Sequence, residues 1–495
     1  MGACAISSWP IPEPTRPCFS RLDQVILQRA FGDESLVRQL RLGMQLGLFQ
    51  LSFGLLGVLI LGLLNRLLIQ DIQLPAVLAA LAVGAQQLMG FTRIWFGHRS
   101  DQMPSGRLRR SPFILASSCA VALLFLLAVR VVLQLARSME LQGLLPSLPW
   151  VGALVLIFIA IGTAIAAGGT AFSALVADRT TEQERPRVLS VVFAMRLLGV
   201  LLGSALVNRV FGTACAIGAS RSEVWAGLER LGVMAPVLLL GLGVASVVGV
   251  ERRFASPVAP GMEPAAPTQR MAPIQLLNRL RSIPQASSFM AVLCLFTFSM
   301  FLNDAILEPY GAAVFGMSVC ATTALNALLA AGFFMGLVVS GFQLIERFGN
   351  IRTAQLGAGF AVLALLLLVL AAPLASTALL RVAVGGFGFA LGVCMNSCLT
   401  LMFSFVEPGR TGFLLGIWGA GYAYSCGLAT ISGGGLLSLF GGGVGDEAFG
   451  AYTGVFAVQI VCFAAAATMT QRLNVRAFRQ RVRVRFGELM AQAAD

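Results

Sequence analysis

The sequence has no lysine, a single histidine and few charged residues, and each scarcity excludes a class of function. Charged residues make up 12% of the 495 residues, whereas soluble proteins carry about 25%, so a soluble globular domain is excluded. Without lysine there is no Schiff-base chemistry and no P-loop lysine for phosphate. Because His98 is the only histidine, a multi-histidine metal site is excluded too.

The cysteines and the basic residues argue against two further functions, namely a cysteine-based metal or redox site and nucleic-acid binding. The ten cysteines include no Cys-x-x-Cys pair, and most fall in apolar segments, where cysteine usually acts as a small hydrophobic residue. All 35 basic residues are arginine, and the net charge is +13. In a soluble domain this charge would indicate nucleic acid. In so apolar a chain arginine determines membrane topology instead, and we expect no nucleic-acid partner.

Long apolar segments account for most of the chain. Hydrophobic residues make up 57% of it, and a spanning helix needs about 20 of them in succession. We predict an all-α polytopic membrane protein with twelve transmembrane helices in two six-helix pseudo-repeats. The first six spans lie near 42–64, 74–96, 113–136, 150–176, 187–211 and 232–250. The second six lie near 287–307, 320–345, 353–372, 377–403, 412–438 and 449–470.

The arrangement of prolines and arginines predicts five regions and an orientation. The predicted regions are an N-terminal segment 1–41, a first half 42–250, a proline-rich linker 251–286, a second half 287–471 and an arginine-rich tail 472–495. Segments on the side of both termini hold 26 of the 35 arginines, and the opposite loops hold seven. Since cytoplasmic loops are enriched in arginine, both termini and the linker are predicted to be cytoplasmic.

Three pairs of short segments, in the same order in each half, predict an internal duplication. The pairs are 64–70 with 302–308, 97–110 with 341–352, and 184–187 with 407–410. The second of these pairs contains Gly97, Asp101, Arg109 and Arg110, which resemble the signature loop of the major facilitator superfamily. That resemblance implies that the acidic side chain caps a helix end and pairs with arginine. The alternative is an ordinary positively charged cytoplasmic loop.

Several motifs resemble the PucC family, also called the bacteriochlorophyll delivery family, which includes LhaA-type assembly factors. The most specific are Leu-Glu-Pro-Tyr-Gly at 307–311 and Val-Phe-Gly-Met-Ser at 314–318, and further matches extend from about residue 42 to 440. The resemblance implies an integral membrane protein of a phototroph, in a cytoplasmic, intracytoplasmic or thylakoid membrane. Its implied partners are chlorophyll or bacteriochlorophyll as cargo, light-harvesting or photosystem polypeptides, and pigment-synthesis enzymes. No permanently bound cofactor is expected.

Ionisable side chains inside spans are costly and are functional candidates. Arg66 corresponds to Asp304 in the repeat, and Asp304 and Glu308 share a helix face. Because the first helices of the two halves face each other in the resembled superfamily, these residues are candidates for an inter-half ion pair. The alternative places all three in water at span ends. Arg196, about three turns inside its span, is a candidate ligand for a carboxylate or a pigment oxygen. Arg93 also lies within a span, but it is only a few residues from Gly97 and is expected to snorkel to the cytoplasmic surface.

Uncharged polar side chains in or beside spans are candidate ligands for the magnesium of a pigment, because hard cations take oxygen or nitrogen donors. They are Gln50, Gln86, Gln87, Asn303, Asn326 and Asn396. The alternative role is hydrogen bonding between helices. His98 is placed in the cytoplasmic loop, where a surface role is favoured.

Three functions are compatible with these features. The first is a non-catalytic assembly factor that binds pigment and light-harvesting polypeptides. The second is a secondary transporter of a small lipophilic or anionic solute, coupled to protons through Asp304 or Glu308. A membrane enzyme of pigment synthesis is disfavoured, since a prenyl-transferring synthase needs paired Asp-rich motifs that the sequence lacks. The arginine-rich tail is expected to bind anionic lipid or an acidic partner.

Overall fold

The computed structural model describes residues 34–65, 67–74, 76–103, 108–211, 221–253, 278, 283–317, 319–406, 410–441, 446–475, 477, 478 and 480. The regular structure of these residues is helical. A helix satisfies every backbone hydrogen bond within its own segment, and this is what a chain in lipid requires. Most of the predicted linker, the N-terminal segment and the tail lie outside the described residues.

The described residues of the first half form eight α-helices and three shorter helical segments. They are α2 (Glu34–Gly57), η1 (Val58–Leu64), η2 (Leu67–Asp71), α3 (Ala76–Gly84), η3 (Ala85–Phe91), α4 (Thr92–Asp101), α5 (Ser111–Gln142), α6 (Leu144–Arg179), α7 (Arg185–Val210), α8 (Arg221–Val247) and α9 (Val250–Arg253). Helix α2 begins eight residues before the predicted start of the first span at residue 42.

The described residues of the second half form seven α-helices and two short helical segments. They are α11 (Pro284–Phe301), η4 (Leu302–Ala305), α12 (Leu307–Phe315), α13 (Val319–Val339), η5 (Ser340–Leu344), α14 (Ile345–Ala371), α15 (Thr377–Ser404), α16 (Thr411–Leu439) and α17 (Asp446–Thr470).

Helical structure occupies each of the twelve predicted segments, although not always as one uniform helix. Within the described residues, nine helices are long and apolar enough to cross a membrane. One of them, Leu325–Ala371, covers two predicted spans. Gly349, with φ 77° and ψ 168°, interrupts the helical conformation between these spans. The segments predicted at 74–96 and 287–307 contain the 3₁₀ turns η3 and η4. The membrane-helical fold is confirmed, and the count of twelve spans stays a prediction.

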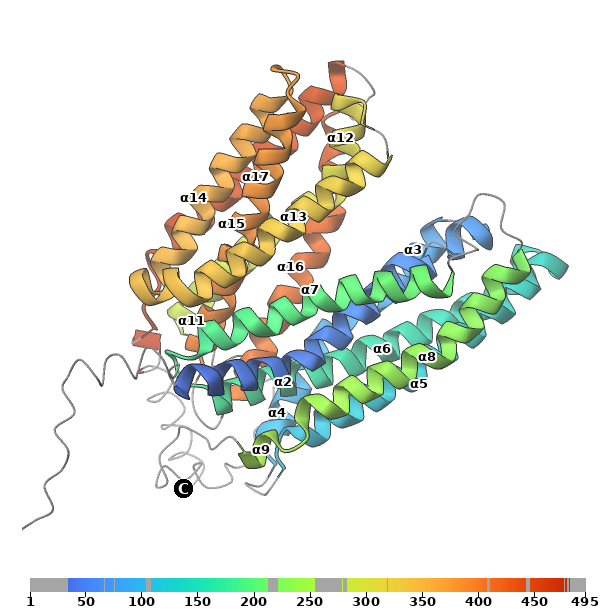
Figure 1. Ribbon diagram of the computed structural model, residues 1–495, viewed down its shortest axis with the longest axis horizontal. Coiled ribbons are helices and arrows are strands. Elements are labelled where there is room, and N and C mark those ends of the chain that lie inside the picture. The colour runs from blue at the N-terminus through green and yellow to red at the C-terminus, as the bar shows by residue number, and fades with distance from the viewer. Residues whose placement is uncertain are drawn as a thin grey trace, which may run out of the picture.

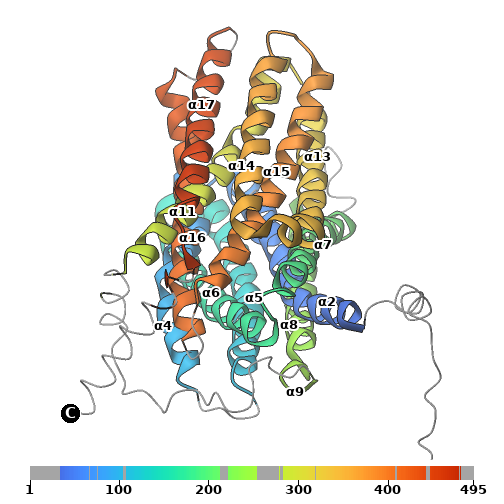
Figure 2. The same ribbon diagram turned by 90° about the vertical axis from the view of Figure 1, so that its left-hand side faces the viewer.

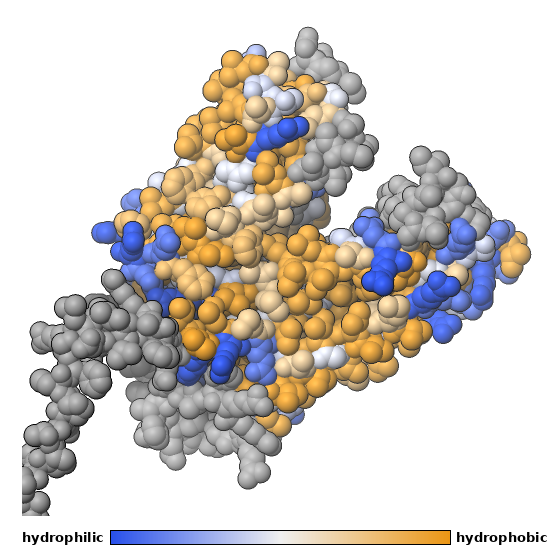
Figure 3. Space-filling model, in the orientation of Figure 1, coloured by the Kyte–Doolittle hydropathy of each residue, from blue (hydrophilic) through white to orange (hydrophobic). Residues whose placement is uncertain are grey.

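The two halves form two bundles that meet at one end and diverge at the other (Figure 1). Figure 3 shows a wedge-shaped opening between them. Figure 2 shows α16 of the second half beside α4 and α6 of the first. Helix α4 runs toward Asp101 and α7 starts at Arg185, so the halves meet at the end that the arginine distribution assigns to the cytoplasm.

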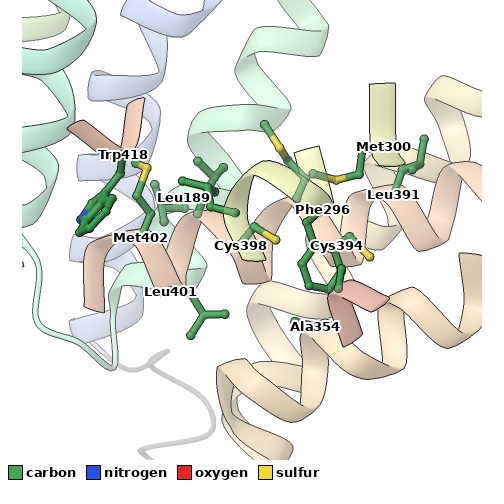
Figure 4. Close-up of a cluster of buried hydrophobic side chains, with 14 of the residues drawn as sticks. Leu189, Phe296, Met300, Ala354, Leu391, Cys394, Cys398, Leu401, Met402 and Trp418 are labelled. Carbon is green, nitrogen blue, oxygen red and sulfur yellow. The ribbon is translucent and has the colours of Figure 1, made fainter. Parts of the chain in front are cut away.

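One hydrophobic core lies within the first half, and a larger one fills the second half and extends across the junction. Figure 4 shows part of the larger core, where Leu189 of α7 lies near Cys398 and Met402 of α15. Outward faces instead expose large apolar side chains, among them Leu156 at 66% and Ile431 at 76% exposure. Exposed apolar surface over whole helices fits contact with lipid.

Candidate functional site

The carboxylate of Asp101, at the end of α4, caps the first turn of α16. Its oxygens accept hydrogen bonds from the backbone N–H groups of Gly412 at 2.9 Å and Phe413 at 2.7 Å. A negative side chain at a helix N-terminus satisfies unpaired N–H groups and interacts favourably with the helix dipole. Because α4 belongs to the first half and α16 to the second, this contact joins the halves. We call it the Asp101 latch.

Arg110 holds the latch in place from the side of α5. Its guanidinium donates to Asp101 at 2.7 Å and to Asp178, near the end of α6, at 3.1 Å. The side chain of Arg110 is buried, and Ser100 accepts a further hydrogen bond from it at 2.5 Å. Burial lowers the pKa of Arg110, but the carboxylates of Asp101 and Asp178 more than offset this and raise it above its ordinary value. The residues therefore act as one charge network.

Glu251 of α9 completes this network, and the sequence analysis missed it. Its carboxylate accepts hydrogen bonds from the backbone N–H groups of Arg109, Arg110 and Ser111, at 2.8, 2.8 and 2.9 Å. It thus caps the N-terminus of α5 as Asp101 caps that of α16. The guanidinium of Arg109 donates to the backbone oxygen of Asp101 at 2.7 Å. Asp101, Arg109 and Arg110 of the predicted signature loop therefore lie together in one network.

Glycines let the helices of the two halves approach closely at this point. A β-carbon at Gly97 would overlap the backbone oxygen of Gly412, and one at Gly416 would overlap that of Arg93. Farther along the same pair of helices, the Tyr424 hydroxyl accepts a hydrogen bond from the backbone N–H of Phe91 at 3.2 Å. Small residues that bring helix backbones together are characteristic of membrane interfaces.

A second contact between the halves joins the start of α7 to η5 and α15. The Asn396 amide donates to Ser190 and to Ser340, both at 3.0 Å. A β-carbon at Gly341 would overlap the Ser190 hydroxyl. Gly341 is the counterpart of Gly97 in the predicted repeat, so each half places this glycine against a helix of the other half. On the same side, Arg187 forms an ion pair with Glu346.

Arg93 and Arg196 lie in the space between the halves. The guanidinium of Arg93 lies beside Gly169, ten residues inside the end of α6, so it does not extend toward the predicted cytoplasmic surface. Arg196 of α7 is exposed and donates to the side-chain oxygen of Gln50 in α2 at 3.4 Å. Arg93 interacts electrostatically with Arg196 and with Tyr422. The structure therefore brings Arg196 and Gln50, both predicted site residues, together with Arg93.

Other predicted site residues are not gathered into this site. Arg66 lies outside the described residues, as do the side chains of Asp304 in η4 and Glu308 in α12, so their ion pair stays a prediction. The predicted magnesium ligands, apart from the neighbours Gln86 and Gln87 of η3, lie on different elements. Gln86 lies on η3 and contacts Gly162 through its backbone, Gln87 is exposed, Asn303 is buried in η4, Asn326 is exposed on α13, and Asn396 is buried in α15.

The hydrogen bonds of Asn396 and His98 favour structural roles. Asn396 uses its amide N–H groups to join the halves, so it acts as an inter-helix hydrogen-bonding residue. His98, in the last turn of α4, has Nε2 at 2.9 Å from the amide nitrogen of Gln102, and its ring lies against Phe413. The sequence analysis placed His98 in the loop, whereas the helix continues past residue 96 and includes it.

Comparison with known families assigns this arrangement. The model of the PUCC protein family matches residues 63–478. The chain belongs to the PUCC protein family. A family relative, the "Bacteriochlorophyll synthase 44.5 kDa chain" of Rhodobacter capsulatus, is 31% identical over 86% of this chain and 93% of its own length. "Protein PucC" of the same organism is 29% identical over 87% of this chain and 92% of its own length.

Solved structures place this PUCC family chain in a known fold. A bacterial homologue of the iron transporter ferroportin, in an outward-facing state, aligns with a TM-score of 0.64 over 88% of this chain and 98% of its own, at 14% identity. The transporter FucP, in the outward conformation, aligns with a TM-score of 0.61 over 88% and 97%, also at 14% identity. At this identity the likeness shows the fold alone, and that fold is the major facilitator fold in an integral membrane protein.

Proposed function

We propose that this chain is a membrane-embedded assembly factor that binds chlorophyll or bacteriochlorophyll and delivers it to light-harvesting or photosystem polypeptides. The observation that carries the proposal is the match to the PUCC family over residues 63–478. One relative takes its name from bacteriochlorophyll, and this name supports a function connected with the pigment. The membrane of a phototroph is the corresponding location, with both termini on the cytoplasmic side.

The physical properties of the pigment support a carrier of this kind. A free chlorophyll is a large apolar ring with a long tail, and it cannot cross water unescorted. The opening between the bundles is bordered largely by apolar surface (Figure 3), and polar side chains such as Arg196 and Gln50 lie among the apolar residues of the spans. An apolar site with few convergent polar groups is typical for ligands of this size. The pigment would be cargo, and no permanently bound cofactor is part of the proposal.

Catalysis is not part of the proposal either, although one relative is named a synthase. The sequence lacks the paired Asp-rich motifs that a prenyl-transferring synthase requires, and the similar solved structures are transporters. In this proposal, pigment-synthesis enzymes are partners that supply the pigment to the chain. The membrane lipid around the bundles and the polypeptides that receive the pigment are the other proposed partners.

A second candidate, a secondary transporter, is favoured by one specific observation. The halves meet at one end only and are open at the other, as alternating access requires of one of its states. In that case a small lipophilic or anionic solute would bind between the halves. Few ionisable groups lie within the described spans, and this weighs against a proton path.

Deletion of the gene distinguishes the two candidates. If the chain is an assembly factor, the deletion should lower the amount of one or more chlorophyll–protein complexes on native gels, while the pigment-synthesis enzymes remain active. Re-expression of the wild-type chain should restore them. Normal amounts of every complex, together with altered uptake or export of a solute, would instead establish the transporter. The absorption spectrum of the chain purified in mild detergent gives an independent reading, since co-purified pigment is expected only for the first candidate.

A further inference from the structure

The side chain of Arg93 lies in a slot that glycines keep open. A β-carbon at Gly169 of α6 would lie 3.2 Å from its Nη1 atom, and one at Gly419 of α16 would lie 3.4 Å from its Cδ atom. Larger residues at these positions would press on the arginine side chain. The slot therefore fixes a permanent cation between α6 and α16, because a guanidinium keeps its proton even when buried.

A second cation, Arg196, interacts with the first, and neither has an acidic partner among the residues that the structure describes. Arg196 is near enough to Arg93 to repel it, and its side chain makes one long hydrogen bond, 3.4 Å, to Gln50. The ion pairs found among the described residues include neither arginine. Helices α7 and α16 contain no acidic residue at all, and the acid of α4 is Asp101, engaged in the latch. Two like charges in a span are costly, so their retention indicates a binding role.

Apolar and sulfur-containing side chains of the second half pack around Tyr422, which interacts with Arg93. The ring of Tyr422, which interacts with Arg93, lies edge-on to Phe301 with ring centroids 5.9 Å apart. Its hydroxyl is 3.8 Å from the sulfur of Met395. A ligand that neutralised the two arginines would therefore have an apolar environment next to its charged group.

We propose that Arg93 and Arg196 together bind the anionic group, a carboxylate or a phosphate, of an amphiphile whose apolar body contacts Tyr422, Phe301 and Met395. The identity of that amphiphile rests on the proposed function. A magnesium chlorin with a free propionate carboxylate has the required charge, whereas its long-chain ester has none. An anionic lipid shares the charge, and the experiment must separate these two sources.

The test uses the full-length chain in a non-ionic detergent and three probes: bacteriochlorophyllide a with a free carboxylate, its ester bacteriochlorophyll a, and phosphatidylglycerol. Binding is measured for the wild type, Arg93→Gln, Arg196→Gln and Arg93→Lys. Arg209→Gln is the matched control, since Arg209 is exposed in the last turn of α7. Each arginine-to-glutamine change at the site should weaken the binding of bacteriochlorophyllide a at least tenfold, because a charge-assisted hydrogen bond to its free carboxylate is lost. Arg93→Lys should restore part of this loss, and the control should bind as the wild type does.

The outcomes distinguish failure of the proposed anion site from failure of the proposed pigment-carrying function. Arginine-dependent binding of phosphatidylglycerol alone would support the anion site with lipid as its source and would count against a pigment role for this site. Equal binding of acid and ester, unchanged in every variant, would overturn the anion site and leave pigment handling in place. If the well-folded wild type bound none of the three probes, both proposals would fail. Because Arg196 is exposed, its variant is expected to fold even if Arg93→Gln does not.

Discussion

Substitution of Asp101 by alanine should release the halves from each other at the predicted cytoplasmic end. The change removes two backbone hydrogen bonds that cap α16 and one partner of the buried Arg110. Loss of an N-cap costs about 1 kcal/mol, and removing one partner of a buried ion pair costs about 3–5 kcal/mol. Since Asp178 remains bonded to Arg110 at 3.1 Å, we expect the loss from the ion pair to fall below this range, to about 2 kcal/mol, so that the total with the lost cap is about 3 kcal/mol.

This energy acts on the equilibrium between conformations, because the latch exists only where the two halves meet. A coupling of about 3 kcal/mol corresponds to roughly a 150-fold change in an equilibrium constant. Spin labels at Arg99 of α4 and Arg347 of α14, both exposed on this side, report the separation of the halves. Pulsed electron paramagnetic resonance should show a new population at longer distance in Asp101→Ala. The background should lack reactive native cysteines, including the exposed Cys119.

Glu251→Gln provides the matched control for the same charge network. It removes one negative charge and weakens a cap of similar geometry, but α9 and α5 belong to the same half. We expect a lower melting temperature and an unchanged distance distribution between the labels. If Asp101→Ala stays monodisperse and keeps the wild-type distribution, the latch does not hold the halves together and the reasoning is refuted.

Three further predictions concern packing, charge pairing and topology. Gly97→Ala should destabilise the protein by about 1–3 kcal/mol through overpacking against α16, whereas Gly84→Ala, which meets open space, should not lower the melting temperature. Arg66→Glu should impair assembly and gain partial rescue from Asp304→Arg; pure additivity in the double-mutant cycle would rule out their contact. A cysteine replacing Pro260 should resist membrane-impermeant labelling of intact cells, and modification there would reverse the topology.

The sequence allowed the latch to be predicted in part, for a physical reason. The acidic residue and the paired arginines lie within one short loop, so their spacing is visible in the chain. Their partners are not, since Glu251 lies 140 residues from Ser111 and Phe413 lies 312 residues from Asp101. A carboxylate just after the last span of the first half was the available signal for Glu251, but nothing local specifies which helix it caps.

Hydropathy predicted where helices lie and could not predict how they are interrupted. The break at Gly349 depends on a backbone conformation that glycine alone adopts readily, and a hydropathy window does not register it. The slot around Arg93 shows the same limit. Gly169 and Gly419 lie 250 residues apart and are ordinary small residues in their own segments, so only the packing of α6 against α16 reveals that they leave room for a guanidinium.

The latch and the arginine site share helices α4 and α16, and this links them energetically. Asp101 lies eight residues, or about 12 Å, beyond Arg93 on α4, and α16 supplies both the capped first turn and the wall that contains Gly419. A ligand that draws Arg93 toward Arg196 therefore acts on the helix that closes the predicted cytoplasmic end. By linkage, any change in ligand affinity caused by opening the latch must equal the change in latch stability caused by the ligand. A carrier that releases its cargo to another protein needs such a coupling, and so does a transporter, whereas a static holder of pigment does not. The spin-label distance between α4 and α14, measured with and without the chlorin acid, therefore distinguishes a moving carrier from a fixed one.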